Sequence, residues 1–289
     1  TRYGVEHTFV DMTDLEKVKA AIQANTKLFY VETPSNPLLK VTDITAISTL
    51  AKSVGAWTFV DNTFLTPALQ KPLELGADLV LHSATKFLSG HSDVVAGLAV
   101  AKDPVLADRL AFLQNSFGAV LGVQDAWLVL RGLKTLHVRL EQSQKSAYKM
   151  ASYLEKHPAV KKVYFPGLTT HPGFTLQHRQ AQGPGAVLSF ELHSEEDLRR
   201  FVGRVEIPVF AVSLGAVESI LSFPAKMSHA AMPEAERLKR GISNSLLRLS
   251  VGLESAEDLI EDFEQAFQQT ITEASGNQEQ RRVYHGNLR

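Results

Sequence analysis

A lysine and an aspartate stand where two predicted strands of this chain end. Lys86 follows an apolar run and the hydroxyl residues Ser83 and Thr85, and Asp61 ends the apolar run 57–60. Ligands of open parallel sheets lie outside the carboxyl ends of the strands, so we expect both side chains at one sheet edge. An amine that forms an imine with an aldehyde, and a carboxylate that keeps a ring nitrogen protonated, suit pyridoxal 5′-phosphate (PLP). Alone, Lys86 is more simply a surface lysine; its combination with Asp61 favours the cofactor.

Two hydroxyls close to Lys86 are candidates for binding the phosphate of PLP. Ser83 and Thr85 precede the lysine by three residues and one residue. Asp61 has an alternative structural role, because an aspartate after a strand commonly caps the segment that follows.

Arg248 and Asn36 are candidates for substrate binding. Arg248 lies within the apolar run 246–251, where a buried guanidinium is costly unless an anion pairs with it. The α-carboxylate of an amino acid would accept two parallel hydrogen bonds from it, and an internal Asp or Glu is the alternative partner. Asn36 lies in a proline-bounded loop after another predicted strand, where its amide could reach the phenolic oxygen of PLP or the substrate carboxylate. Taken alone, Asn36 is more simply a turn residue, and Ser213 is equally ambiguous.

Composition excludes several classes of protein. The 289 residues are 44% hydrophobic and 21% charged, as in a globular protein long enough for two domains. A net charge of −1 gives no reason to expect nucleic-acid binding, and no apolar run reaches the length of about 18 residues that a membrane span needs. The chain has no cysteine, which removes disulfides and thiolate chemistry and permits a cytoplasmic location. His82 and His91 form no metal-binding motif, so we expect no metal site.

Strands and helices alternate in the first hundred residues. We predict strands at 6–10, 27–31, 57–60, 78–81 and 94–100, and a helix from about Asp43 to Val54 with Gly55 after its end. The spacing of Thr13 and Glu16 predicts a capping box at the start of an earlier helix. Continuous apolar strands between helices are typical of a parallel α/β sheet.

The pattern becomes helical from about residue 103 to 156 and then mixed. A stripe of apolar residues predicts a buried helix face: Trp127, Leu130, Leu133, Leu136 and Leu140. Strands are expected near 163, 187–190 and 247–250, with helices near 198 and from 259 to 267. We therefore predict a large α/β domain over 1–136, a linking helix with a smaller α+β domain over 137–271, and a disordered tail over 272–289.

Five motifs, in order, resemble one known family. The segment 83–93, Ser-Ala-Thr-Lys-Phe-Leu-Ser-Gly-His-Ser-Asp, resembles the PLP-attachment signature of the cystathionine/methionine-metabolism (trans-sulfuration) PLP-dependent enzymes. The resemblance continues through 32–37, 60–64, 213–215 and 248–254. It implies the aspartate-aminotransferase fold (fold type I) and a homo-oligomer, a dimer of dimers with shared active sites. It also implies roles for the candidate residues: Lys86 as the Schiff-base lysine and proton shuttle, Asp61 as the pyridinium partner, Ser83 and Thr85 on the phosphate, and Asn36, Ser213 and Arg248 on the substrate carboxylate.

Within that family, Val212 favours β-elimination. Several γ-synthases and γ-lyases have Glu just before Ser-Leu-Gly, whereas the apolar residue here, with segments 115–120 and 226–233, resembles bacterial cystathionine β-lyases. The expected reaction converts cystathionine to homocysteine, pyruvate and ammonia. The alternative is chemistry at Cγ, as in cystathionine γ-lyase, γ-synthase or O-acetylhomoserine thiolyase. A remote alternative is a non-catalytic PLP- or amino-acid-binding protein, which would show no turnover.

The family's N-terminal segment has no counterpart in this sequence. It contains an arm that reaches the neighbouring subunit, a phosphate-binding glycine turn and a tyrosine stacked on the cofactor. We therefore expect that the chain starts inside a domain and, as it stands, binds PLP weakly.

Overall fold

The computed structural model describes residues 3–268, and the chain forms two compact units. Unit 1 runs to Val138 and also includes Pro166–Gly185; unit 2 comprises Arg139–Phe165 and the chain from Ala186 onward. The domain ranges expected from the sequence stay a proposal, and the tail 272–289 lies outside the described residues. Within residues 3–268, no helix combines the length and apolar character that crossing a membrane requires.

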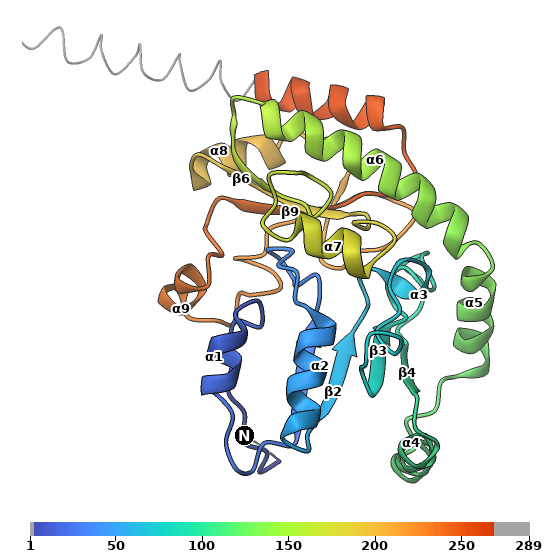
Figure 1. Ribbon diagram of the computed structural model, residues 1–289. Helices are drawn as coiled ribbons and strands as arrows, with labels where there is room; N and C mark the ends of the chain where they lie inside the picture. The colour runs from blue at the N-terminus through green and yellow to red at the C-terminus, as the bar shows by residue number, and fades with distance from the viewer. Residues whose placement is uncertain (1–2, 269–289) are drawn as a thin grey trace, which may run out of the picture. The chain divides into compact units, whose positions relative to one another are not determined.

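Unit 1 is built on a four-stranded sheet with the order β1-β2-β3-β4 (Figure 1). The first three strands are parallel and β4 is antiparallel to β3. In this register Glu32 lies opposite Asp61, and Asp61 lies opposite Leu81. The carboxyl ends of β1, β2 and β3 therefore meet at one edge, as predicted. The strands are β1 (Leu28–Glu32), β2 (Trp57–Asp61), β3 (Leu79–Ser83) and β4 (Gly97–Ala101).

Helices of unit 1 cover one face of its sheet. Figure 1 shows α2 beside β2, and apolar side chains of α1 and α2 pack there against Phe29, Val31 and Val60. Residues of β1 alternate between exposed and buried positions, so its other face points away from this core. The helices of the unit are α1 (Leu15–Ala20), α2 (Ile44–Ser53), α3 (Thr66–Leu69), α4 (Pro104–Phe117), α5 (Val123–Leu133) and α7 (Phe174–Gln180).

Local signals set the ends of α2 as predicted. Asp43 is its N-cap, and the carboxylate accepts a hydrogen bond from the Ala46 N–H at 3.0 Å. Val54 is the C-cap, and Gly55 follows in the left-handed conformation with φ 68°. The capping residue of α1 was predicted one position too early, because Asp14 rather than Thr13 accepts the hydrogen bonds from the first turn.

Two other predictions from the pattern are wrong. Residues 6–10 form no strand, since no neighbouring strand pairs with them and most of them are exposed. The apolar stripe of the helical region is buried at Leu136 and Leu140, but Trp127 and Leu130 are 52% and 62% exposed. Periodicity identifies an apolar helix face without identifying what covers it.

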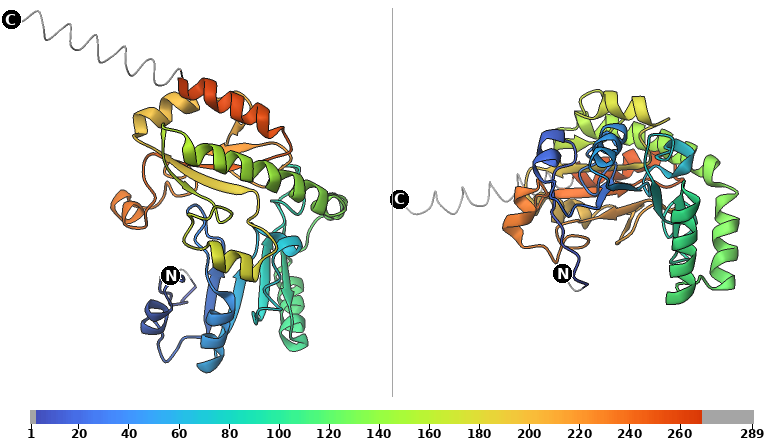
Figure 2. Two further views of the ribbon diagram at one scale, coloured as in Figure 1. Left: turned by 45° about the horizontal axis from the view of Figure 1, so that its top comes forward. Right: turned by 60° about the horizontal axis from the view of Figure 1, so that its bottom comes forward.

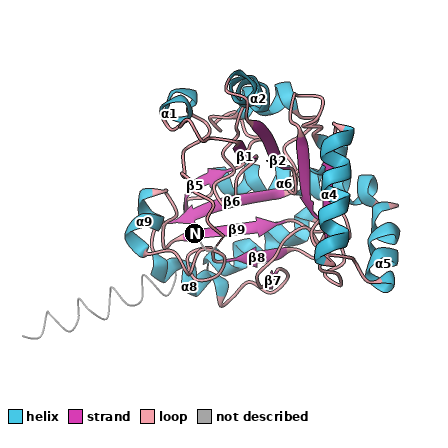
Figure 3. Ribbon diagram, turned by 90° about the horizontal axis from the view of Figure 1, so that it is seen from below, coloured by secondary structure: helices cyan, strands magenta, loops and turns pink. Residues whose placement is uncertain are grey.

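Unit 2 contains a five-stranded sheet with the order β5-β6-β9-β8-β7. Figure 3 shows β6 and β9 running side by side, and they are antiparallel. Its strands are β5 (Val160–Tyr164), β6 (Val187–Leu192), β7 (Val209–Phe210), β8 (Ile220–Ser222) and β9 (Leu246–Ser250). Its helices are α8 (Glu195–Val202), α9 (Glu234–Lys239), most of α6 (Leu136–Lys156), which begins in unit 1, and residues 256–268.

The helix at 256–268 lies along α6 (Figure 2). The Tyr153 hydroxyl of α6 donates a hydrogen bond to Glu264 at 2.6 Å. Four fully buried aromatic rings from the helix at 256–268, β6 and α8 form the core of the unit: Phe190, Phe201, Phe263 and Phe267. Aromatic contacts of this kind add to the free energy gained from burial.

Replacing Gly132 in α5 tests how tightly this helix packs on the turn after β3. A Cβ at Gly132 would lie 2.2 Å from the carbonyl oxygen of Ser89, which is backbone and cannot rotate away. We expect Gly132→Ala to lower the free energy of unfolding by about 1–3 kcal/mol, more than the gain of about 1 kcal/mol in helix propensity. Chemical denaturation measures this. Gly97→Ala is the control, because its Cβ would lie 3.9 Å from the nearest atom; equal stability of the two variants would contradict the packing.

Candidate active site

Three of the predicted residues lie at the carboxyl edge of the sheet in unit 1. Asp61 ends β2, Ser83 ends β3, and Lys86 lies in the turn 84–89 that follows. The Lys86 N–H donates to the carbonyl oxygen of Ser83 at 3.1 Å, and the Lys86 carbonyl accepts from the Gly90 N–H at 2.8 Å. Both hydrogen bonds fix the backbone that carries the lysine.

Thr63 connects Asp61 with Ser83. Its backbone N–H donates to Asp61 Oδ1 at 3.0 Å, and its hydroxyl oxygen accepts from the Ser83 N–H at 2.8 Å. The carboxylate and the start of the lysine-bearing turn are therefore held by one residue. The Ser83 hydroxyl takes no part in this link.

The carboxylate of Asp61 also accepts a hydrogen bond from a tyrosine that the sequence analysis missed. The Tyr30 hydroxyl on β1 lies 3.4 Å from Asp61 Oδ2. Burial, followed by the negative charges of Asp61 and Glu32, raises the pKa of Tyr30 to about 12, so the phenol stays neutral and can donate. The alternation of side chains along a strand could have identified Tyr30. Tyr30 and Glu32 share one face of β1, beside the strand that ends in Asp61.

The environment of Asp61 fits the protonated ring nitrogen of PLP. Asp61 is only partly buried, and within residues 3–268 its carboxylate forms no ion pair with a Lys, Arg or His side chain. The two groups that donate hydrogen bonds to it, the Tyr30 hydroxyl and the Thr63 N–H, are neutral, so they orient the carboxylate without supplying a positive charge. A cationic ring nitrogen would supply the missing positive charge.

His82 lies on β3 close to Asp61 and is buried. Desolvation lowers the pKa of His82, and the negative charge of Asp61 opposes this shift. Its Nδ1 is buried and has no hydrogen-bond partner among the described residues. A neutral imidazole does not neutralise Asp61, so the carboxylate keeps its charge for another partner.

Asn36 lies in a loop whose backbone is held by hydrogen bonds to the Glu32 side chain and within the loop. The Asn36 N–H donates to Glu32 Oε2 at 3.2 Å, and the Leu39 N–H donates to the Ser35 carbonyl at 2.8 Å. Leu39 has φ 52°, a conformation that is uncommon outside glycine. The loop is therefore a defined structure that presents Asn36 after the end of β1, as predicted.

Thr85 makes hydrogen bonds that bear on its predicted phosphate contact. Its hydroxyl donates to the Ala96 carbonyl at 3.3 Å and accepts from the Ala96 N–H at 3.0 Å. A hydroxyl has a single proton to donate, so a bond from Thr85 to phosphate would replace the one to the carbonyl. The phosphate-binding role of Thr85 stays a prediction, and among residues 3–268 the Ser83 hydroxyl makes no such competing bond.

The other two predicted residues lie together in unit 2. Arg248 is in the middle of β9 and is 3% exposed. Its Nη2 donates to the Ser213 carbonyl at 2.6 Å and to the Ser222 hydroxyl at 3.1 Å. Ser213 has φ 85°, a strained conformation that the contact with Arg248 helps to hold. Both bonds go to uncharged oxygens, and they orient the guanidinium.

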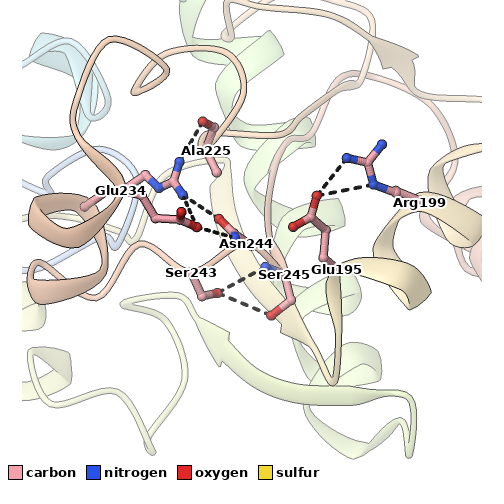
Figure 4. Close-up of polar contacts among 8 residues, drawn as sticks. Glu195, Arg199, Ala225, Glu234, Ser243, Asn244 and Ser245 are labelled. Carbon is pink, nitrogen blue, oxygen red and sulfur yellow. Dashed lines mark hydrogen bonds and ion pairs between the residues drawn. The ribbon is translucent and has the colours of Figure 1, made fainter.

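A second buried arginine supports the loop near Arg248. Arg237 Nη1 donates to the Ala225 carbonyl at 2.9 Å, and Nη2 contacts Glu234 and Asn244 (Figure 4). His229 lies in the same loop. Burial, and then the positive charges of arginines including Arg248 and Arg237, lower the pKa of His229. Burial and the nearby arginines therefore both favour the neutral form of His229.

Comparison with known proteins assigns the chain to a family. Residues 1–268 match the Cys/Met metabolism PLP-dependent enzymes, and the chain belongs to this family. Cystathionine beta-lyase MetC of Bacillus subtilis (strain 168) is 64% identical over 269 residues, 93% of this chain and 69% of the relative. Cystathionine gamma-lyase of the same organism is 53% identical over 267 residues, 92% of this chain and 70% of the relative.

Solved structures give the same assignment. Cystathionine gamma-lyase from Lactobacillus plantarum, complexed with L-serine, superposes with a TM-score of 0.88 at 47% identity, covering 90% of this chain and 68% of the other. The fold is that of the fold type I PLP-dependent enzymes, and the cofactor is PLP, as predicted.

Proposed function

We propose that this enzyme is a carbon–sulfur lyase that cleaves cystathionine by β-elimination. With uptake of one water, cystathionine yields homocysteine, pyruvate and ammonia. The observation that carries the proposal is Val212, an apolar and 63% exposed residue next to Ser213. The 64% identity to a cystathionine beta-lyase supports it, and cystathionine gamma-lyase and gamma-synthase relatives keep chemistry at Cγ as the alternative.

The residues of unit 1 would hold the cofactor and move the proton. Bound PLP supplies an electron-withdrawing ring that stabilises negative charge at the substrate Cα. Lys86 would anchor PLP covalently and, once the substrate amino group has displaced its Nζ, the freed amine would take the Cα proton. Asp61 keeps the ring nitrogen protonated, with Thr63 and Tyr30 orienting its carboxylate. Ser83 and Thr85 bind the phosphate through their hydroxyls.

The residues that recognise the substrate are assigned from their hydrogen-bonding capacity. Arg248 binds the α-carboxylate, because its guanidinium is fixed by the Ser213 carbonyl and the Ser222 hydroxyl before substrate arrives. Preorganisation of this kind reduces the entropy lost on binding. Ser213 and Asn36 are each proposed for the same role, as the family resemblance implies.

An exposed apolar face supports the expected homo-oligomer. Six large apolar residues of α4 and α5 in unit 1 are more than half exposed: Val105, Phe112, Phe117, Val123, Trp127 and Leu130. Apolar surface of this extent usually marks an interface. We infer that this face is buried between copies in a dimer of dimers. The cytoplasmic location also stays a prediction, which cell fractionation would check.

The product identifies which carbon–sulfur bond is cut. With cystathionine as substrate, we expect pyruvate to form faster than 2-oxobutyrate, as measured by separating the two oxo acids. Val212→Glu adds a carboxylate just before Ser213, where several γ-acting members of the family have one, and should raise the share of 2-oxobutyrate. Dominant 2-oxobutyrate from the unchanged enzyme would transfer the assignment to a γ-lyase.

Lys86 should be the residue that carries PLP. Borohydride reduction of the holoenzyme followed by peptide mapping should find the pyridoxyl group on Lys86, since this lysine follows the strand next to Asp61. Lys86→Ala should remove the label, and Lys102→Ala, at an exposed lysine of the same unit, should keep it. A label on any other lysine would overturn the assignment.

Disrupting the apolar face should reduce the size of the assembly. Trp127→Asp places a charge where we infer contact between copies, so sedimentation velocity should report smaller species than for the unchanged protein. Tyr148→Asp is the control, because Tyr148 is an aromatic residue of nearly equal exposure on α6. Equal sedimentation of Trp127→Asp and the unchanged protein would refute the interface.

A further inference from the structure

The side chain of Gln70 joins the ends of two strands at the candidate site. Gln70 is 1% exposed and directly follows α3 in unit 1. Its Nε2 donates to the Thr33 carbonyl at 3.2 Å and to Asn62 Oδ1 at 3.0 Å. Thr33 directly follows β1, and Asn62 directly follows β2. One amide group therefore spans the gap between the two strand ends.

The orientation of both amides in this contact is fixed by their partners. Asn62 Nδ2 donates to the Thr66 carbonyl at 3.0 Å and to the Gln70 carbonyl at 2.8 Å, so Asn62 Oδ1 must be the acceptor. Gln70 then faces two acceptors, Asn62 Oδ1 and the Thr33 carbonyl, and only its NH₂ group can satisfy them. The other amide orientation would place oxygen against oxygen.

The backbone of Gln70 is anchored from the opposite side. Gln70 forms an antiparallel bridge with Ala181, and the Gln182 N–H donates to the Leu69 carbonyl at 2.8 Å. The Gln70 N–H donates to the Thr66 carbonyl at 3.2 Å. A side chain that extends from such a fixed backbone sets the position of whatever it binds.

The polar side chain of Gln70 has a cost that packing alone does not explain. Its Oε1 is buried and has no hydrogen-bond partner among the described residues. An unsatisfied buried acceptor is unfavourable, and an apolar side chain of similar size would avoid it. The two donated bonds are therefore the feature that distinguishes glutamine from methionine or leucine here.

The two bonds lead to the residues proposed to act on cofactor and substrate. Thr33 begins the loop that carries Asn36, and Asn62 adjoins Asp61. We propose that Gln70 is a positioning residue that sets the spacing between Asn36 and Asp61. This inference rests on the proposed function of those two residues. Gln70 acts on them through its hydrogen bonds to Thr33 and Asn62.

Gln177 provides a matched control for the experiment. It is fully buried in the same unit, its Nε2 donates to one carbonyl, that of Gly183, at 2.7 Å, and its Oε1 also lacks a partner among the described residues. Gln177→Met removes a buried amide of the same kind with no link to Thr33 or Asn62. Any loss of stability that comes only from replacing a buried amide with an apolar group should therefore appear in both variants.

Gln70→Met should weaken PLP binding about tenfold and raise the KM for cystathionine, a change equivalent to one net hydrogen bond. Fluorescence titration of the apoenzyme with PLP measures the first quantity, and steady-state kinetics the second. Gln177→Met should lower the melting temperature of the apoenzyme about as much as Gln70→Met does, with little change in PLP affinity or in KM. Equal PLP affinity and KM in the two variants would show that Gln70 is structural only.

Gln70→Glu gives a second readout that depends on the donor role, and keeps the test open if Gln70→Met fails to fold. A buried carboxyl has a raised pKa, and its protonated form still has one O–H to donate. The ionised form would face two acceptors and repel them. Relative to the unchanged enzyme, PLP affinity of this variant should fall as the pH rises; a constant ratio would overturn the proposal.

Failure of the proposed function can be told apart from failure of this inference. If the unchanged enzyme binds no PLP or Asp61→Ala and Asn36→Ala leave binding and KM unaltered, the assignment of those residues is wrong and the role of Gln70 falls with it. If those variants are impaired while Gln70→Met behaves as Gln177→Met does, the function stands and only the positioning role is refuted.

Discussion

Parallel pairing of β1, β2 and β3 is the constraint on which the candidate site depends. The register that places Glu32 opposite Asp61 ends the strands at one edge, and every residue proposed to bind PLP either ends one of these strands or follows its end. The same arrangement leaves backbone donors and acceptors beyond the last ladder bond. Each must find a partner, since a buried unpaired group costs about 1–3 kcal/mol. Thr63 and Gln70 supply those partners and so connect the strand ends.

Charge at this edge is controlled by surrounding Asp61 with neutral groups. Tyr30 has a raised pKa and His82 a lowered pKa, so both are uncharged near neutral pH. Neither therefore competes with a ligand cation for the carboxylate. In unit 2, the Ser213 carbonyl and the Ser222 hydroxyl accept hydrogen bonds from Arg248 and fix the direction of its guanidinium.

The sequence could predict residues whose role is set by their position at the end of a strand. The positions of Lys86 and Asp61 near the ends of strands could be predicted because apolar runs and their polar termini are local signals. Tyr30 and Gln70 were missed because their contacts join residues 31 and 37 positions apart, and only the register of the sheet brings those residues together. The stripe through Trp127 was identified correctly as apolar and wrongly as buried, since periodicity reports the chemistry of a face and not its neighbour.

Buried amides explain why such a site can be both rigid and specific. An apolar residue at position 70 would fill the same volume, but dispersion contacts tolerate small displacements of their partners. A hydrogen bond is directional and weakens steeply when its angle changes, so the two bonds of Gln70 restrict both distance and orientation. Proton transfer by a lysine depends on such placement, because reacting groups held in the correct geometry avoid the entropy loss of a chance encounter. The unsatisfied Oε1 of Gln70 is then the energetic cost of fixing two strand ends with a single side chain.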